Sequence, residues 1–450
     1  MTARRQPNSY LKDTIPKLFR PARASDLDEV CELLATPRRG PEYFHALFQS
    51  DPAFEPGQIR VAWTGGHIVA CVKMYPRLLR IGTTVVSAGG IGNLRTEPRH
   101  QRRGLATSLL AECISAMRLQ GVVLAPLFAA RHTLFLRQGW RLLREPTLEL
   151  SAEALTTSAE IGPRGRVIRL PQEVKIRPLE DGDLDAVLAL QESVNVARTG
   201  SAVRDCAAWL GSLAALNARG ARLLVAEHAG EIAGYVVAQP WQDRRERRVE
   251  VLELLLAPWL QDAWRPLLRG ALAAAGDATT LSASLPRDYR ALIAAALGTR
   301  DGAGDAGHGG DAGNAGDAGD AETAHERDDL MVRIVDPPRL LKEIVPLLVT
   351  RLRQAPAPDP LRLRVGPLRG GVALSIADTR IAIDTPSRDD PYALPESTFL
   401  ALLFGTEDAY ARLRDPAPYG GLPPLPDWAQ DTLERLFPPQ DWIYWRSDAF

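Results

Sequence analysis

The sequence predicts an α/β chain in which two similar modules are followed by a third, different α+β domain. Three observations carry this prediction: an internal repeat, the alternation of extended β-branched runs with helical periodicity inside each copy, and a change of pattern after residue 336. A chain of 450 residues is long enough for several domains, each with its own hydrophobic core.

The repeat is clearest at the start of each copy. Arg20-Pro21 returns 157 positions further on as Arg177-Pro178. In both copies the Arg-Pro pair ends a short strand, an aspartate six residues after the arginine stands where it can cap a helix, and apolar residues follow at helical spacing. A β-hairpin with a glycine turn is predicted next, at residues 59–72 in the first copy and 223–237 in the second.

The first module contains a motif that is typical of an anion site. Gln101 to Ala106 reads Q-x-x-G-x-A, follows an extended run at residues 90–95, and leads into an apolar helix. Unpaired amides and the positive end of the helix dipole converge at such a helix start. Gly104 would let a phosphate approach the backbone, and Arg102 and Arg103 add positive charge. The motif therefore predicts a cofactor that carries a pyrophosphate.

The second module lacks this motif. At the equivalent place, residues 251–260 keep an extended run and a proline, but no glycine turn or arginine pair follows. We interpret the second module as a degenerate copy that retains the fold and has lost the phosphate site. One cofactor site per chain is expected.

These patterns divide the chain into three parts. The predicted parts are residues 1–158, 172–336 and 337–450. Within the second part, residues 301–328 are rich in Gly, Asp and Ala, which bury too little apolar area to offset the entropy of ordering, so a disordered insertion is expected. Residues 330–335 are predicted to form the last strand of the second module.

The third part ends in an unusual way. Chain ends are usually polar and frayed, but residues 436–450 are rich in aromatic side chains up to the final Phe450. We therefore expect this tail to dock into a groove.

Composition excludes several classes of partner. Lys and Arg number 54 and Asp and Glu 55, a balance that gives no support for a nucleic acid or a polybasic membrane contact. No apolar run approaches the ~20 residues of a membrane span, and the N-terminus has no signal-peptide pattern. The four cysteines show no zinc-like spacing, so no metal is expected. A cytoplasmic protein is predicted.

The residues described above resemble the GCN5-related N-acetyltransferases (GNAT). The Arg-Pro start, the hairpin and the Gln101 to Ala106 turn follow that family's order. The degenerate second copy and the aromatic tail narrow the resemblance to the enhanced-intracellular-survival (Eis-like) acetyltransferases, over nearly the whole chain. This resemblance implies mixed central sheets splayed at their middle strands, a sterol-carrier-like third domain, acetyl-CoA as cofactor and a homo-oligomer, hexameric in some relatives.

The resemblance also implies which residues bind acetyl-CoA. Main-chain groups after the extended run would line the pantetheine arm, the glycine turn would hold the pyrophosphate, and a later turn would touch the cofactor again. These residues are, in that order, Leu94, Arg95 and Thr96; Arg102, Arg103, Gly104, Leu105, Ala106 and Thr107; and Ala130 and Arg131.

The catalytic groups are implied less completely. In the Eis-like enzymes the C-terminal carboxylate, here that of Phe450, acts as the general base. The tyrosine that protonates the leaving thiolate is replaced by Phe135, which has no proton to give. Three responses are open: the thiolate leaves without help, since a thiol pKa of about 8.5 is tolerable; Tyr75 or His132 substitutes; or the domain binds acyl-CoA without efficient turnover.

The predicted activity is therefore an acetyl-CoA-dependent N-acetyltransferase, an acyltransferase in which a primary amine attacks the thioester directly in a ternary complex. The resemblance suggests a polyamine-like, aminoglycoside-like or lysine amine as acceptor, and the sequence does not choose among them. The alternative is a non-catalytic acyl-CoA or lipid-binding module on the same fold.

Overall fold

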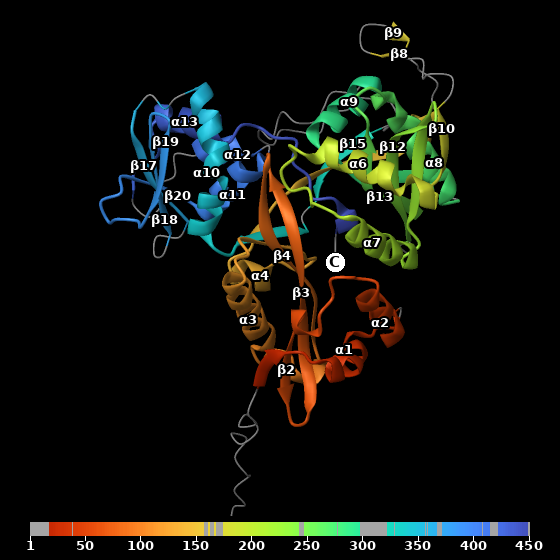
Figure 1. The fold of residues 1–450 in the computed structure, drawn as a ribbon, viewed down its shortest axis with the longest axis horizontal. Coiled ribbons are helices and arrows are strands. Elements are labelled where there is room, and N and C mark those ends of the chain that lie inside the picture. Colours follow the sequence, from red (N-terminus) through yellow and green to blue (C-terminus); the bar gives the residue numbers. More distant parts are fainter. Residues whose placement is uncertain are drawn as a thin grey trace, which may run out of the picture.

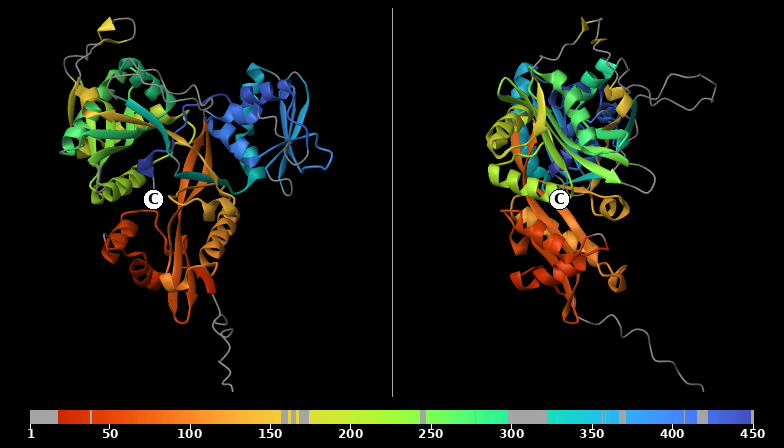
Figure 2. Two further views of the ribbon diagram at one scale, coloured as in Figure 1. Left: turned by 180° about the vertical axis from the view of Figure 1, so that it is seen from behind. Right: turned by 90° about the vertical axis from the view of Figure 1, so that its right-hand side faces the viewer.

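A computed structural model describes the protein over residues 18–37, 39–156, 161–162, 166–167, 174–242, 247–276, 278–297, 322–327, 329–355, 357, 359–366, 371–406, 408–414 and 422–448. Three lobes surround a long central hairpin (Figure 1). The hairpin consists of β3 (His67–Ile81) and β4 (Thr84–Thr96). It belongs to the first module and extends between the two other lobes, as the left view of Figure 2 shows.

The first module is built on a mixed seven-stranded sheet. Its strand order is β1 (Leu18–Pro21), β2 (Ile59–Thr64), β3, β4, β5 (Leu124–Phe128), β16 (Leu330–Ile334) and β6 (Arg141–Leu142). Helices α1 (Leu27–Leu34) and α2 (Pro41–Gln49) pack on one face, α3 (Leu105–Leu119) packs on the other, and α4 (Thr133–Arg137) follows β5. Alternate residues serve the two faces, since Val61 and Cys71 pack with α1 and α2 while Ala62 and Val72 pack with α3.

The second module repeats this plan. Its sheet has the order β10 (Lys175–Pro178), β11 (Arg222–His228), β12 (Glu231–Gln242), β13 (Arg247–Leu256), β14 (Thr280–Ser284), β7 (Glu145–Ser151) and β15 (Glu322–Arg327). The helices are α5 (Ala152–Thr156), α6 (Leu184–Asn195), α7 (Cys206–Ala218), α8 (Trp264–Ala274) and α9 (Arg287–Leu297). A two-stranded pair, β8 (Ile161–Gly162) and β9 (Arg166–Val167), lies between the modules in the sequence.

The repeated Arg-Pro pairs lie at equivalent places in the two sheets. Arg20 pairs with Val61 across β1 and β2, and Arg177 pairs with Val225 across β10 and β11. The aspartate six residues later does not cap α1 or α6 with its side chain. It accepts two hydrogen bonds from the arginine instead, at 2.6 and 3.0 Å in the first copy and 2.6 and 2.8 Å in the second. The repeat therefore preserves an ion pair that ties the first strand to the first helix.

The two modules exchange strands. β16 pairs with β5 and β6 of the first sheet, so the expectation that residues 330–335 close the second module is wrong. In return β7 leaves the first module and pairs antiparallel with β14 and β15. The exchange buries both strands, with Leu148 and Leu330 at most 2% exposed. Each module thus completes the sheet of the other.

The expected insertion is shorter than predicted at its C-terminal side. Residues 322–327 form β15 and pair with β7, which corrects the assignment of disorder up to residue 328. Residues 301–321 lie outside the described part of the chain.

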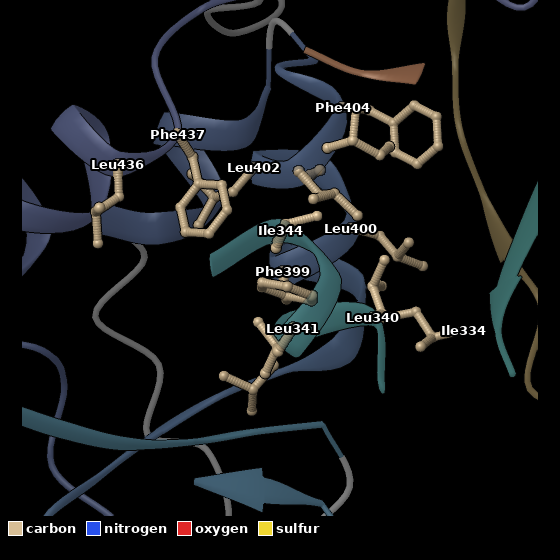
Figure 3. Packing of buried hydrophobic residues seen from close by; sticks show 14 of the residues in the cluster. Ile334, Leu340, Leu341, Ile344, Phe399, Leu400, Leu402, Phe404, Leu436 and Phe437 are labelled. Atoms are coloured by element: carbon tan, nitrogen blue, oxygen red, sulfur yellow. The ribbon is translucent and has the colours of Figure 1, made fainter. Parts of the chain in front are cut away.

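The third lobe has a four-stranded sheet of order β19 (Arg380–Asp384), β18 (Val372–Ala377), β17 (Leu361–Val365) and β20 (Tyr392–Leu394). Helices α10 (Pro337–Gln354), α11 (Glu396–Phe404), α12 (Ala409–Arg414) and α13 (Asp427–Leu436) pack with it. Figure 3 shows the core between these helices, where Leu340, Ile344 and Phe399 meet Phe437. Leu79 of β3 and Val86 of β4 join the same cluster, so the central hairpin anchors this lobe.

The C-terminal tail connects the lobes, as predicted for an aromatic segment that docks. Trp442 and Tyr444 pack into the core of the third lobe, while Ile443 and Trp445 pack into the core of the second module. Short 3-10 turns complete the fold at Ala24–Asp26, Pro56–Gln58, Pro98–His100, Asp181–Asp183, Gln261–Ala263 and Arg446–Asp448. No described helix has both the length and the apolar composition needed to cross a membrane.

Candidate active site

The turn before α3 has the geometry of an anion cradle. Arg102 and Gly104 both adopt left-handed backbone conformations, with φ of 61° and 80°. The first amide bonded along the helix is that of Ser108, which donates to Gly104 O at 3.0 Å. The amides of the first turn therefore point out of the helix end, where its dipole is positive.

This cradle is open to a ligand. The residues from Gln101 to Gly104 are exposed, and a Cβ built on Gly104 would meet no atom within 4 Å. The Gln101 side chain holds the approach to the turn by donating to Thr96 O at 3.3 Å. The predicted pyrophosphate residues, 102–107, are thus brought together in a shape and charge that fit a pyrophosphate.

A β-bulge lies beside the cradle. Cys71 pairs with Arg95 and Lys73 pairs with Gly92, which leaves Asn93 and Leu94 without partners on β3. Asn93 has φ of 52°, so the bulge re-aims the chain at the end of β4. Of the three residues predicted to line the pantetheine arm, Leu94 belongs to this bulge, and Arg95 and Thr96 follow it in the paired part of β4.

The sheet opens next to this bulge. β4 and β5 pair in parallel at Ala88 with Leu124 and at Ile91 with Leu127, after which β4 continues to Thr96. Because the two strands are parallel, the bulge and the turn after β5, which holds Ala130 and Arg131, lie at the same sheet edge. The gap between two splayed parallel strands is where a ligand can reach main-chain amides.

The candidate acid residues have different surroundings. Phe135 of α4 packs edge-on against Trp140 with 6.0 Å between ring centroids, as a core aromatic residue does. Nε2 of His132 is buried and has no hydrogen-bond partner among the described residues. Tyr75 accepts a hydrogen bond from Nδ2 of Asn93 at 2.8 Å, which links its hydroxyl to the bulge, and burial raises the pKa of Tyr75. Phe450 lies outside the described residues.

A cavity of about 510 Å³ lies on the other side of Tyr75. Its walls come from the C-terminal end of α2 and the residues that follow it, the central hairpin, the whole length of the second module's α7 with the residues on either side of it, and the tail residues Ser447 and Asp448. This volume is within the range of small-molecule sites. Tyr75 therefore separates the bulge from a space where a second substrate fits.

Lys73 forms part of the structure behind this cavity. Its side chain is 1% exposed and its Nζ lies 4.1 to 5.0 Å from the ring centroids of Tyr75, Phe54 and Phe48. Burial lowers the pKa of Lys73 to about 8, and the carboxylate of Asp51, 3.3 Å from Nζ, opposes this shift.

A buried charge cluster that no sequence motif indicates lies at the tail. Arg204 donates from Nε to Asp448 at 2.7 Å, from one terminal nitrogen to both oxygens of Glu253 at 2.9 and 3.1 Å, and from the other to Ser447 at 2.8 Å. Tyr235 also donates to Glu253, at 2.7 Å. Burial alone would lower the pKa of Arg204, but the charges of Asp448 and Glu253 raise it.

Comparisons with known proteins agree with this geometry. Residues 19–143 match the model of the acetyltransferase (GNAT) domain, so the first module holds a GNAT acetyltransferase domain. An uncharacterized N-acetyltransferase of Streptomyces avermitilis is 33% identical over 86 residues. That match covers 19% of this chain and spans about a fifth of the relative, 21% of its length.

Solved structures share the whole fold. A GCN5-related N-acetyltransferase from Anabaena variabilis ATCC 29413 superposes with a TM-score of 0.65 at 13% identity, covering 97% of this chain and 100% of the other. A GCN5-related N-acetyltransferase from Kribbella flavida superposes with a TM-score of 0.62 at 18% identity, covering 97% of this chain and 99% of the other. Eis1 from Mycobacterium abscessus superposes with a TM-score of 0.60 at 16% identity, covering 97% of this chain and 100% of the other. The mixed α/β class predicted from the sequence is confirmed.

Proposed function

We propose that the protein is an acetyl-CoA-dependent N-acetyltransferase of the Eis-like type, acting on a primary amine in the cytoplasm, with a third domain that is sterol-carrier-like. The observation that carries the proposal is the exposed left-handed turn at Gly104 beside the bulge in β4. A pyrophosphate bound on this turn leaves the rest of a coenzyme A molecule free to extend along Leu94 to Thr96.

Each group then has one task. The amides at the start of α3, with Arg102 and Arg103, hold the pyrophosphate, and the bulge amides near Leu94 and Arg95 meet negative charge that develops on the thioester oxygen. Acetyl-CoA supplies the activated acetyl group. The acceptor amine arrives through the cavity beyond Tyr75 and attacks the carbonyl carbon. The nitrogen then loses a second proton to solvent, the C–S bond breaks, and coenzyme A leaves as the thiolate.

The proposed general base is the terminal carboxylate of Phe450, which removes a proton from the acceptor ammonium. What supports it is the path of the tail, whose last described residues, Ser447 and Asp448, line the cavity. An apolar setting raises the pKa of a carboxyl group and makes it a better base, and Tyr444 and Trp445 beside the path are both 1% exposed.

No acid is assigned to position 135. Phe135 packs on Trp140 and has no proton to donate, so the thiolate leaves unaided, as a group with a thiol pKa of about 8.5 can near neutral pH. Tyr75 is the less favoured substitute, because its raised pKa keeps the phenol protonated but disfavours the anion it would become.

Release of free thiol from acetyl-CoA tests the proposal with a panel of primary amines. Turnover is expected, and removal of Phe450 alone is expected to lower kcat with unchanged acetyl-CoA affinity. If the full chain binds acetyl-CoA but none of the amines in the panel yields free thiol, the protein is a non-catalytic acyl-CoA-binding module and not an enzyme. If removal of Phe450 leaves kcat unchanged, the terminal carboxylate is not the base.

A further inference from the structure

The charges that line the 510 Å³ cavity differ in whether they are already compensated. Two of its carboxylates, Asp51 and Asp448, pair with a cation, and the third, Asp205, is held by a backbone amide. Asp51 accepts from Lys73 at 3.3 Å and from the amide of Ala53 at 3.1 Å. Asp205 caps α7 through the amide of Ala208 at 2.7 Å, and Asp448 binds Arg204.

Two arginines in the lining are not compensated. Arg77 of β3 is half-buried and donates only to the carbonyl of Pro76, at 2.9 Å, among the described residues. Arg219, which follows α7, is half-buried and donates from Nε to the hydroxyl of Tyr43 at 3.3 Å. Neither arginine forms an ion pair with a carboxylate in the described part of the chain. Both arginines line the cavity, and among the described residues their remaining guanidinium donors are not paired with an anion.

The two arginines reach the cavity from different modules and meet around one residue. Arg77 lies 5.8 Å from the ring centroid of Tyr75, and the positive charges of Arg77 and Arg219 both oppose the burial that raises the pKa of Tyr75. Arg219 also contacts α2 through Tyr43. They therefore place positive charge on the wall that separates the cavity from the bulge.

A polycationic amine does not match this lining, because it would add positive charge next to two arginines that form no ion pair with any carboxylate of the described residues. An anion matches it, since a guanidinium binds a carboxylate or phosphate through paired hydrogen bonds. Oδ2 of Asp448 has no hydrogen-bond partner among the described residues, but it is buried and does not face the cavity. The charge that the cavity offers to a ligand is therefore the positive charge of the two arginines.

We propose that the acceptor is a small amine that also carries an anionic group, a carboxylate or a phosphate, and that Arg77 and Arg219 bind this anion. The inference rests on the proposed acetyl transfer, and it names the substrate class for the same site. It separates this protein from acetyltransferases that take polyamines or aminoglycosides.

Matched pairs of amines test the inference in the full-length protein. Propylamine against 3-aminopropanoate and ethanolamine against phosphoethanolamine compare each amine with its anionic counterpart, and spermidine represents the polycations. We expect kcat/KM to be at least tenfold higher for the anionic member of each pair. Arg77→Gln and Arg219→Gln are each expected to lower that value about 10- to 100-fold, mainly through KM, as the loss of a charge-assisted hydrogen bond does. The neutral amines should change less than about threefold.

Two controls make the result specific. Arg353→Gln removes an exposed arginine of α10, remote from the lining, and should leave all values unchanged. Acetyl-CoA affinity should stay the same in every variant, which shows that the first module is folded. A preference for spermidine or the neutral amines, or an anionic preference that survives both substitutions, would overturn the inference while leaving acetyl transfer intact.

Binding measurements keep this inference separate from the proposed function. Calorimetry with phosphoethanolamine and 3-aminopropanoate, without acetyl-CoA, should show binding to the wild type and at least tenfold weaker binding to the two arginine variants. Absence of thiol release from every amine, together with this binding pattern, would reject acetyl transfer and retain the anion site. Absence of binding would reject the anion site, whatever the turnover.

Discussion

Replacing Arg204 by methionine removes the one positive charge that Glu253 and Asp448 share. Glu253 is fully buried and Asp448 is 4% exposed, so neither carboxylate can turn to water for compensation. Methionine keeps a long unbranched side chain and the packing against Trp209, whose ring centroid lies 4.4 Å from the guanidinium carbon. The substitution therefore tests the charge and its hydrogen bonds more than the volume.

The expected cost follows from the contacts. Each ion pair, with charges about 4 Å apart, is worth roughly 4 kcal/mol at an effective dielectric constant of 20. Part of this stabilisation only offsets the desolvation of Arg204 itself, which the variant no longer needs. Removing one partner from a buried pair typically costs about 3 to 5 kcal/mol, and we adopt that range for Arg204→Met at pH 7.

Acid should reduce this cost. Burial raises the pKa of Glu253 above its ordinary value of 4.5, and Arg204 opposes that rise. In the variant the opposition is gone, so the folded-state pKa of Glu253 moves further above the unfolded value. A group with a raised folded pKa binds its proton more readily in the folded state, and the penalty is present above that pKa and fades as the pH falls towards the unfolded value. The defect should therefore be smaller at pH 5 than at pH 7.

Hydrogen exchange measures this effect locally, which suits a chain with several domains because no two-state assumption is needed. The amides of residues 443–448 and of β13 should exchange faster in Arg204→Met by a factor on the order of hundreds to thousands, which corresponds to the range above. The double variant Arg204→Met with Glu253→Gln should recover part of the loss. A change of less than about tenfold, or a larger defect at pH 5 than at pH 7, would refute the reasoning.

Three further outcomes are expected. Gly104→Ala places a Cβ on a residue with φ of 80°, at a cost of about 1 to 2 kcal/mol, and should weaken acetyl-CoA binding about tenfold by calorimetry. The control Gly65→Ala, with φ of 62° in a hairpin turn, should leave that affinity unchanged. Equal effects of the two substitutions would show that the turn at Gly104 is not part of the cofactor site. Phe135→Tyr should change kcat far less than the ~10²-fold that a required general acid contributes, and a gain of that size in steady-state turnover would show that an acid is missing. Lys73→Met should stabilise the protein below pH 8, because burial lowers the pKa of Lys73 to about 8 in the folded state, compared with 10.5 in the unfolded state. Below pH 8, keeping the buried amine protonated costs the folded state up to about 3 kcal/mol. This cost disappears as the pH rises towards 10.5. A lower denaturation midpoint for Lys73→Met than for the wild type at pH 6.5 would show instead that its pairing with Asp51 outweighs the desolvation.

Local chemistry explains which features the sequence predicts correctly. The turn at Gly104 and the hairpin turns at Gly65 and Gly230 require left-handed backbone, which glycine adopts readily, and all three have positive φ. Alternating and β-branched runs then identify the strands on either side. Each of these features is decided by residues that are neighbours in the sequence.

The strand exchange could not be predicted in the same way. β7 and β16 have the apolar character that any buried strand has, and nothing within residues 145–151 or 330–334 specifies which sheet they join. Their partners are fixed by loop reach and by packing across long sequence separations. The assumption that a strand belongs to the module that precedes it in the sequence was therefore the error.

The buried charge cluster was missed for a related reason. Arg204, Glu253 and Asp448 are ordinary charged residues in the sequence, where they read as exposed. Only the fold brings Arg204 within hydrogen-bond distance of Glu253, 49 positions away, and of Asp448, 244 positions away. No periodicity or motif marks such a cluster, because its members meet only after two domains and the tail have packed together.

This arrangement gives the second module a role although it lacks the phosphate turn. Its residues Arg204, Asp205 and Arg219 line the cavity together with the hairpin of the first module. The tail closes the cavity through Ser447 and Asp448, and Arg204 fixes its position. If the acceptor binds there, the first module determines the acyl donor, while the second module and the tail, together with Arg77 of the hairpin, determine which amine is acetylated. Substitutions in the second module should then change acceptor preference while acetyl-CoA affinity stays constant.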